Sequence, residues 1–100
     1  MELHLVQKGK WYDMVESGEK PEEYRDNTPY WKKRLDPLVF KCFRSDPQVF
    51  EKDYVVFHRG YTLRTMKFVI AAVRLGIGKK EWGFEGEDLK YIIELGERIF

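Results

Sequence analysis

The sequence predicts an α+β domain, a small mixed β-barrel of about five to six strands with two short helices near its N-terminal half. Runs rich in β-branched and aromatic residues fill the second half, whereas the first half holds two segments with apolar residues at helical spacing. The chain has 100 residues, 43% of them hydrophobic and 16% aromatic. That length suits one core and not two, so we expect a single domain over residues 1–100.

The N-terminal quarter is expected to form a strand, a helix and a second strand. Residues 2–5 alternate polar and apolar side chains, which predicts a short half-buried strand. Residues 9–17 carry apolar side chains at helical spacing, and Gly18 is placed to end that helix in a left-handed conformation. Residues 22–26 then favour an extended conformation.

A second helix is expected to follow, and after it the pattern is less regular. Thr28 suits an N-cap and Pro29 a first helical residue. The Asp-Pro pairs at 36–37 and 46–47 mark turns, and residues 38–43 favour either a short buried strand or a helical turn.

The second half predicts three strands and one polar loop. A strand is expected from residue 54 to near Gly60, and a longer one over residues 65–75. Residues 78–88 form the polar loop, and the final strand covers residues 91–95. In such a barrel the sheet edges close on each other and the helices cover an open end.

The charge is unevenly distributed along the chain, although the net charge is only +1. Residues 32–80 hold twelve Lys or Arg against four Asp or Glu, and the remaining residues hold six against thirteen. If the basic segment gathers on one face, it attracts phosphates. The alternative is a solvated surface on which these cations face acidic partners.

Composition also predicts the compartment and the cofactors. No apolar run is long enough to span a membrane, and the N-terminus lacks the apolar run of a signal peptide, so a soluble cytoplasmic protein is expected. The single cysteine, Cys42, excludes an internal disulfide and is interpreted as a core thiol. His4 and His58 have no metal-ligand spacing to the carboxylates, so no metal and no other cofactor is predicted.

The run GEKPEEYRD, residues 18–26, concentrates ionisable side chains at the entry to a strand. In an extended chain Glu23 and Arg25 share one face. Pro21 donates no ladder hydrogen bond, so a kink there can bring Lys20 beside them and line a cleft. The alternative is a solvated edge strand whose charges deter aggregation.

The same run fits the signature G-x-K-x-x-E-x-R, with Gly18, Lys20, Glu23 and Arg25 at its defined positions. The segments KGKWYDMVESGEKPEEYRDNTPYWKKRL, VVFHRGY, RTM and RLGIGKKEWG extend the likeness over nearly the whole chain, most weakly across residues 36–53. The sequence thus resembles the ASCH domain family of the PUA-like superfamily, in its compact single-domain bacterial and phage form. The resemblance implies a PUA-like barrel and a nucleic-acid-linked role, because related domains bind RNA, single nucleotides and modified bases.

The leading interpretation is therefore an RNA- or nucleotide-binding module. Its cleft is expected between the GEKPEEYRD strand and the VVFHRGY segment. Lys20 and Arg25 would contact phosphate or a base carbonyl, Glu23 a base or sugar donor, and Tyr24 or Tyr61 would stack on a base. One residue of strand register decides whether Glu22 or Glu23 faces the cleft. The further candidate ligand-binding residues are Tyr30, His58, Arg59 and Trp82, and for Trp82 core packing is the favoured alternative.

Two other functions stay open. Some ASCH relatives resemble amidohydrolases of a modified cytidine; here Lys20 matches their lysine, Glu23 stands at the place of their threonine nucleophile, and residues 65–75 hold no matching acid. As a hydrolase of a modified nucleoside or of RNA, the protein would use Glu23 as a general base and Lys20 to polarise the reacting group. For ribonuclease chemistry, Tyr61 and His58 are also of suitable type. The third possibility is a structural or regulatory module that binds a protein through an exposed apolar patch.

Overall fold

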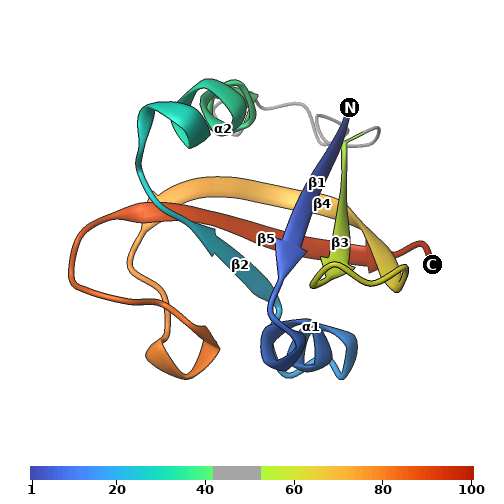
Figure 1. Cartoon of the computed structure of the whole chain (residues 1–100). Helices are drawn as coiled ribbons and strands as arrows, with labels where there is room; N and C mark the ends of the chain where they lie inside the picture. The colour runs from blue at the N-terminus through green and yellow to red at the C-terminus, as the bar shows by residue number, and fades with distance from the viewer. Residues whose placement is uncertain (42–52) are drawn as a thin grey trace.

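The computed structural model describes residues 1–41 and 53–100 and shows a five-stranded mixed sheet with two α-helices (Figure 1). The expectations for residues 42–43 and for the Asp46-Pro47 turn, including Cys42, lie outside the described residues. The elements in chain order are β1 (Glu2–Gln7), α1 (Gly9–Glu16), β2 (Glu22–Arg25), α2 (Pro29–Lys41), β3 (Tyr54–Arg59), β4 (Thr65–Gly76), a 3₁₀ turn (Lys80–Trp82) and β5 (Lys90–Arg98).

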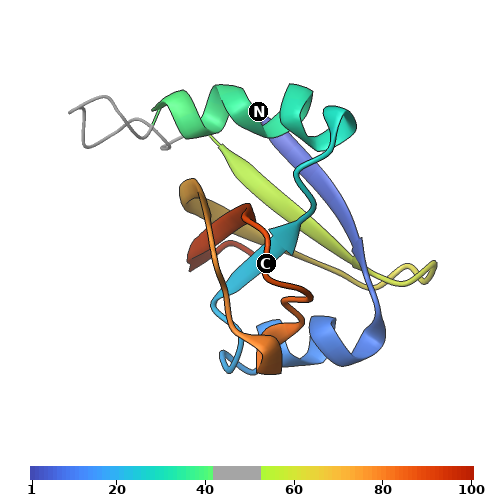
Figure 2. The ribbon, with the colours of Figure 1, turned by 90° about the vertical axis from the view of Figure 1, so that its left-hand side faces the viewer.

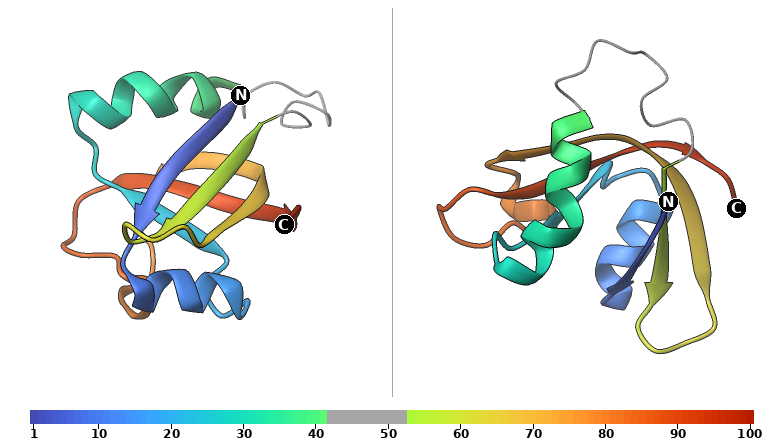
Figure 3. Two further views of the ribbon diagram at one scale, coloured as in Figure 1. Left: turned by 45° about the vertical axis from the view of Figure 1, so that its right-hand side comes forward. Right: turned by 90° about the horizontal axis from the view of Figure 1, so that it is seen from above.

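The strands lie in the order β1-β3-β4-β5-β2, with β1 and β3 parallel and every other neighbouring pair antiparallel. The sheet bends into a half-barrel, with α2 at one end and α1 at the other (Figures 1 and 2). The left view of Figure 3 shows β1 and β3 side by side, crossing in front of β5. The predicted closure of the edges does not occur in the described part, because β1 and β2 are not hydrogen-bonded neighbours. Side chains of both edges line the gap instead.

The main core lies inside the half-barrel. Strand β1 alternates exposed and buried residues, as its sequence predicts, and its buried face carries Leu3, Leu5 and Gln7. Helix α2 closes one end with the fully buried Leu35 and Leu38. Removing such side chains from water is the main contribution to the stability of this fold.

A second, smaller cluster packs Tyr24, Phe84 and Ile92 together, with Trp82 at its border. Tyr24 and Phe84 meet edge to face, with ring centroids 5.1 Å apart. The chain passes so near the Tyr24 ring that a Cβ on Gly78 would lie 2.3 Å from its Cε1 atom, so only glycine fits there. This cluster fixes the 79–84 loop against β2 and β5.

Helix α2 is longer than the sequence predicts. It begins as expected at Pro29, and the Trp31 N–H points to the Thr28 Oγ1 at 3.5 Å. It then continues through Pro37 to Lys41, so the turn predicted at Asp36-Pro37 is wrong. Proline deprives the carbonyl four residues earlier of its amide partner. Residue 33 is exposed, so its carbonyl can be hydrated, and burial of Leu38 favours the continued helix.

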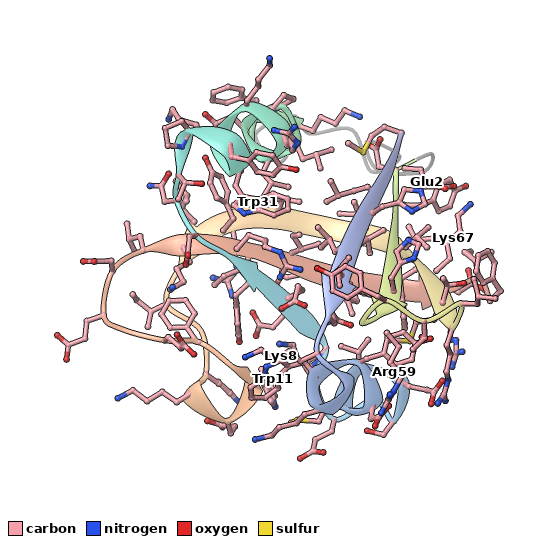
Figure 4. The ribbon with its side chains drawn as sticks, in the orientation of Figure 1. Glu2, Lys8, Trp11, Trp31, Arg59 and Lys67 are labelled. Carbon is pink, nitrogen blue, oxygen red and sulfur yellow. The ribbon has the colours of Figure 1, made fainter. Side chains whose placement is uncertain are left out.

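In the described part of the basic segment 32–80, six of the ten cations pair with carboxylates, and they lie on a helix, on strands and in a hairpin alike. These cations are Lys32, Lys41, Arg59, Arg64, Lys67 and Arg74. Figure 4 labels two of them, Arg59 and Lys67. The solvated, acid-paired surface is therefore the better description. No helix in residues 1–41 or 53–100 has the length and apolarity to cross a membrane.

The hydroxyl of Tyr91 connects β5 to α2 by donating a hydrogen bond to Asp36 Oδ1. Burial, together with that bond, raises the pKa of Tyr91 to about 12. The folded-state pKa lies above the ordinary value of 10. The stability that the Tyr91 hydroxyl contributes is therefore fully present below pH 10 and is lost as pH rises toward 12.

At pH 8 we expect Tyr91→Phe to lower the free energy of unfolding by about 1.5–3 kcal/mol. The deficit should shrink at pH 10 and again at pH 11, in urea titrations.

The control is Tyr61→Phe, because the Tyr61 side chain is fully exposed. It should leave the free energy of unfolding unchanged at pH 8. A deficit of Tyr91→Phe that stays constant from pH 8 to 11 would contradict the assigned role of the hydroxyl.

Candidate functional site

A pocket of about 500 Å³ lies between the two edges of the half-barrel, where β1 and β2 fail to pair. It runs from the start of α2 to the start of α1. Its lining comes from both edge strands, both helices and the loop after the 3₁₀ turn. The lining residues are His4, Leu5, Val6, Gln7, Lys8, Trp11, Lys20, Glu23, Tyr24, Arg25, Tyr30, Trp31 and Gly83.

Lys20 enters the pocket wall because the chain reverses after α1. Gly18 adopts the left-handed conformation that the sequence predicts, with φ of 85°, and Pro21 precedes β2. The Lys20 ammonium is almost completely buried, at 1% exposure; it lies 3.1 Å from Glu23 Oε1 and donates to the Trp82 carbonyl. Burial lowers the pKa of Lys20, and the nearby Glu23 carboxylate opposes that shift.

Glu23 is the centre of the hydrogen-bonding network. Its Oε1 accepts the N–H of Tyr24 at 2.8 Å and faces the Lys20 ammonium. Its Oε2 accepts from Gln7 Nε2 and lies 3.4 Å from Nη1 of Arg25. Each carboxylate oxygen therefore has two polar contacts, one hydrogen bond and one ion pair. Glu23 therefore acts here as a buried junction rather than as a free base.

Arg25 bridges the gap between the two edge strands. Its Nη1 donates to the Tyr24 carbonyl at 2.7 Å, and its Nη2 donates to the Val6 carbonyl of β1 at 3.2 Å. The guanidinium also lies over the Trp31 ring, 5.4 Å from its centroid. A planar cation with five donors suits this double task, because it can bond and stack at once.

Gln7 contributes the most unusual polar group of the pocket. The side chain is only 3% exposed, at the end of β1, and its Nε2 donates to Glu23. Its Oε1 is buried and has no hydrogen-bond partner among the residues that the structure describes. Buried acceptors are normally paired, so this oxygen is an exception.

Aromatic rings form the walls. In Figure 4 Trp31 lies beneath α2, whereas Trp11 and Lys8 lie at the start of α1. Tyr30 meets Trp31 edge to face, with ring centroids 4.8 Å apart. The Lys20 ammonium lies 4.9 Å from the centroid of the Trp11 ring. The pocket thus combines flat apolar surfaces with buried charge.

The structure brings Lys20, Glu23, Tyr24 and Arg25 of the predicted set into one pocket, together with Tyr30. Glu23, and not Glu22, faces it. Glu22 lies near Arg74 on the other side of the strand, 3.6 Å from its Nη2. Trp82 contributes its main-chain carbonyl, while its ring packs beside Tyr24.

Besides Trp82, the structure places three predicted residues outside the lining of this pocket. His58 Nε2 lies 2.8 Å from His4 Nδ1, and it is His4 that lines the pocket. Arg59 is held by Asp13 of α1 at 3.0 Å and lies on the far side of that helix from Trp11 (Figure 4). Tyr61 is fully exposed in the β3–β4 turn.

The predicted cleft between the GEKPEEYRD strand and the VVFHRGY segment is therefore corrected. The wall opposite β2 is β1, because the sheet order places β3 inside the sheet and β1 at its edge. Three lining residues, Gln7, Trp11 and Trp31, were not predicted to belong to a site. For Gln7 the sequence did hold a signal. The alternation of β1 puts this polar residue on the same buried face as Leu3 and Leu5.

Comparison with protein-family models, with curated proteins and with solved structures gives no match. Within residues 1–41 and 53–100, no group of three His, Cys, Asp or Glu side chains is arranged to hold a metal ion. The geometry of the pocket is therefore the basis for assigning a function.

The buried Glu23 carboxylate should contribute most to the stability of the contact between β1 and β2. Glu23→Gln leaves the Lys20 ammonium buried without its anionic partner, which typically costs about 3–5 kcal/mol. We expect a loss of that size in the free energy of unfolding, measured by urea titration. The control is Asp13→Asn, which breaks the solvent-exposed pair with Arg59 and should cost less than about 1 kcal/mol. Equal losses in the two variants would contradict a structural role for Glu23.

Proposed function

We propose that the protein is a PUA-like domain of the ASCH type that binds RNA or a nucleotide in the pocket between β1 and β2. The observation that carries this proposal is the combination of aromatic walls and cations in one pocket of about 500 Å³. Volumes of this order are typical of small-ligand sites. A nucleobase is a flat ring with a polar edge, and this pocket offers surfaces for both.

The aromatic rings support the binding of a base. Trp11 and Trp31 present faces on which a base can stack, and stacking is the usual way in which proteins hold unpaired bases. Tyr30 is more than half exposed beside Trp31, so it suits the next base of a strand or a sugar.

The cations support binding of the phosphate or of a base carbonyl. Arg25 uses part of its donor set on the two edge strands and retains further N–H groups. Lys8 is exposed at the rim of the pocket, where an ammonium can meet phosphate without a desolvation cost. Lys20, in contrast, is engaged by Glu23 and Trp82 and holds the floor of the pocket in place.

The filled carboxylate favours binding over catalysis. A general base needs a free lone pair within hydrogen-bonding reach of its substrate. Each Glu23 oxygen already has two polar contacts, with Tyr24 and Lys20 at Oε1 and with Gln7 and Arg25 at Oε2. Proton abstraction by Glu23 would therefore require one of these partners to leave.

The second candidate function is hydrolysis of a modified nucleoside or of RNA. One observation favours it, namely the lowered pKa of the buried Lys20 in a pocket, because perturbed lysines are common at catalytic sites. Each ligand that binds should be incubated with the protein and analysed by mass spectrometry. We expect it to remain intact. Cleavage that Lys20→Met abolishes, in a variant shown to be folded, would make the protein a hydrolase.

The binding proposal is tested by titrating nucleosides, nucleotides and short single-stranded RNAs while recording tryptophan fluorescence. Trp11 and Trp31 line the pocket, so binding should change their emission. We expect Lys8→Ala and Arg25→Ala each to weaken the binding of the best phosphate-bearing ligand by about 10-fold, since a hydrogen bond to a charged group contributes about 1.5–3 kcal/mol.

The matched control is Lys33→Ala, an exposed cation of α2 that does not line the pocket. It should leave the dissociation constant unchanged at physiological salt. Equal weakening by all three substitutions would indicate non-specific attraction of phosphate, and unchanged binding in all three would place the ligand elsewhere.

A further inference from the structure

We infer that Gln7 selects the ligand: its side-chain carbonyl accepts a hydrogen bond from an exocyclic amino group of a base that carries an acceptor beside it, as adenine and cytosine do. This inference rests on the proposed function, because it names the class of base that the pocket between β1 and β2 takes. It makes Gln7 a specificity-determining residue and assigns it no part in chemistry.

The chemistry of Glu23 fixes which way the Gln7 amide points. An ionised carboxylate only accepts hydrogen bonds, so its partner must be the amide NH₂ group. The bond from Gln7 Nε2 to Glu23 Oε2 therefore leaves Oε1 as the buried acceptor that lacks a partner among the described residues. The Tyr24 N–H, Lys20 and Arg25 hold the Glu23 carboxylate in place. The carboxylate therefore cannot turn away to accommodate a Gln7 amide whose oxygen and NH₂ group have exchanged places.

The buried position of Gln7 makes its free oxygen selective. The side chain lines the pocket and is 3% exposed, and its Oε1 lacks a partner in the described part of the chain. A ligand that presents an N–H to this oxygen satisfies it. A ligand of the same shape without that donor leaves it buried and unpaired, which is the larger penalty.

Arg25 supplies the complementary half of the recognition pattern. Gln7 Nε2 and Arg25 Nη1 both contact Oε2 of Glu23, so the Gln7 acceptor and the Arg25 donors are neighbours. A base edge that matches them has a donor next to an acceptor. Adenine has this arrangement at its amino group and N1, and cytosine at its amino group and N3. Uracil has no exocyclic amino group and can meet the Gln7 acceptor only through its N3–H, so the amino group is the feature that the inference concerns.

Two matched ligand pairs test the inference in the wild-type protein. Adenosine is compared with purine riboside, and cytidine with pyrimidin-2-one riboside, so that each pair differs only in the amino group. Dissociation constants are measured by tryptophan fluorescence and by calorimetry. We expect the amino-bearing member of at least one pair to bind about 10-fold more tightly, the size typical of one hydrogen bond in a buried site.

Gln7→Met then tests the assignment to this residue, because it preserves length and apolar volume but removes the acceptor. We expect it to bind the two members of the pair equally, with a circular-dichroism spectrum and unfolding transition that show a folded protein. A preference that survives in Gln7→Met would overturn the role of Gln7. If that variant does not fold, the wild-type pairs alone decide.

The outcomes separate the inference from the function on which it rests. Equal binding within both wild-type pairs would overturn the selection of amino-bearing bases and leave the nucleotide-binding proposal intact. Absence of binding for all four nucleosides, and for nucleotides and short RNAs, would overturn the proposed function and this inference with it.

Discussion

The buried carboxylate of Glu23 is the interaction on which the rest of this structure depends. It joins β1 through Gln7, the turn after α1 through Lys20, and β2 through its own neighbours Tyr24 and Arg25. A charge at 5% exposure is costly unless it is paired and hydrogen-bonded, and both Glu23 oxygens have a hydrogen bond and an ion pair. The network therefore compensates for its own burial and at the same time connects the two unpaired edges of the sheet.

The open seam explains why a pocket exists at this place. Had β1 and β2 paired, a backbone ladder would have used the Val6 carbonyl and brought the strands within about 5 Å of each other. Instead Arg25 takes that carbonyl from the opposite edge, and side chains hold the strands apart. An edge strand is usually exposed to unwanted pairing. Here the charged bridge and the two helices protect the edges, and the space between them remains open to a ligand.

Local sequence signals were sufficient for most of the elements but not for their arrangement. The alternation in β1, Gly18 after α1 and the Thr28-Pro29 start of α2 are short-range patterns, and each appears where it was predicted. The length of α2 was missed because burial of Leu38 and the Asp36–Tyr91 hydrogen bond outweigh the cost of Pro37, and both depend on distant strands. Lys20, Glu23 and Arg25 were predicted together because a kink over six residues is local. Their partner wall was not predicted, because the parallel pairing of β1 with β3 connects residues about fifty positions apart.

A neutral amide placed between a ligand and a buried carboxylate has a distinct chemical effect. The Glu23 charge polarises the Gln7 amide through its NH₂ group, which strengthens the carbonyl at the other end as an acceptor. A ligand bound as we propose would meet a strong acceptor without meeting a negative charge, so a phosphate-bearing ligand would not be repelled at the pocket floor. The amide also does not titrate, so its acceptor character does not change with pH. A carboxylate that contacted the ligand directly would lose both properties, which gives a physical reason for Glu23 to act through Gln7.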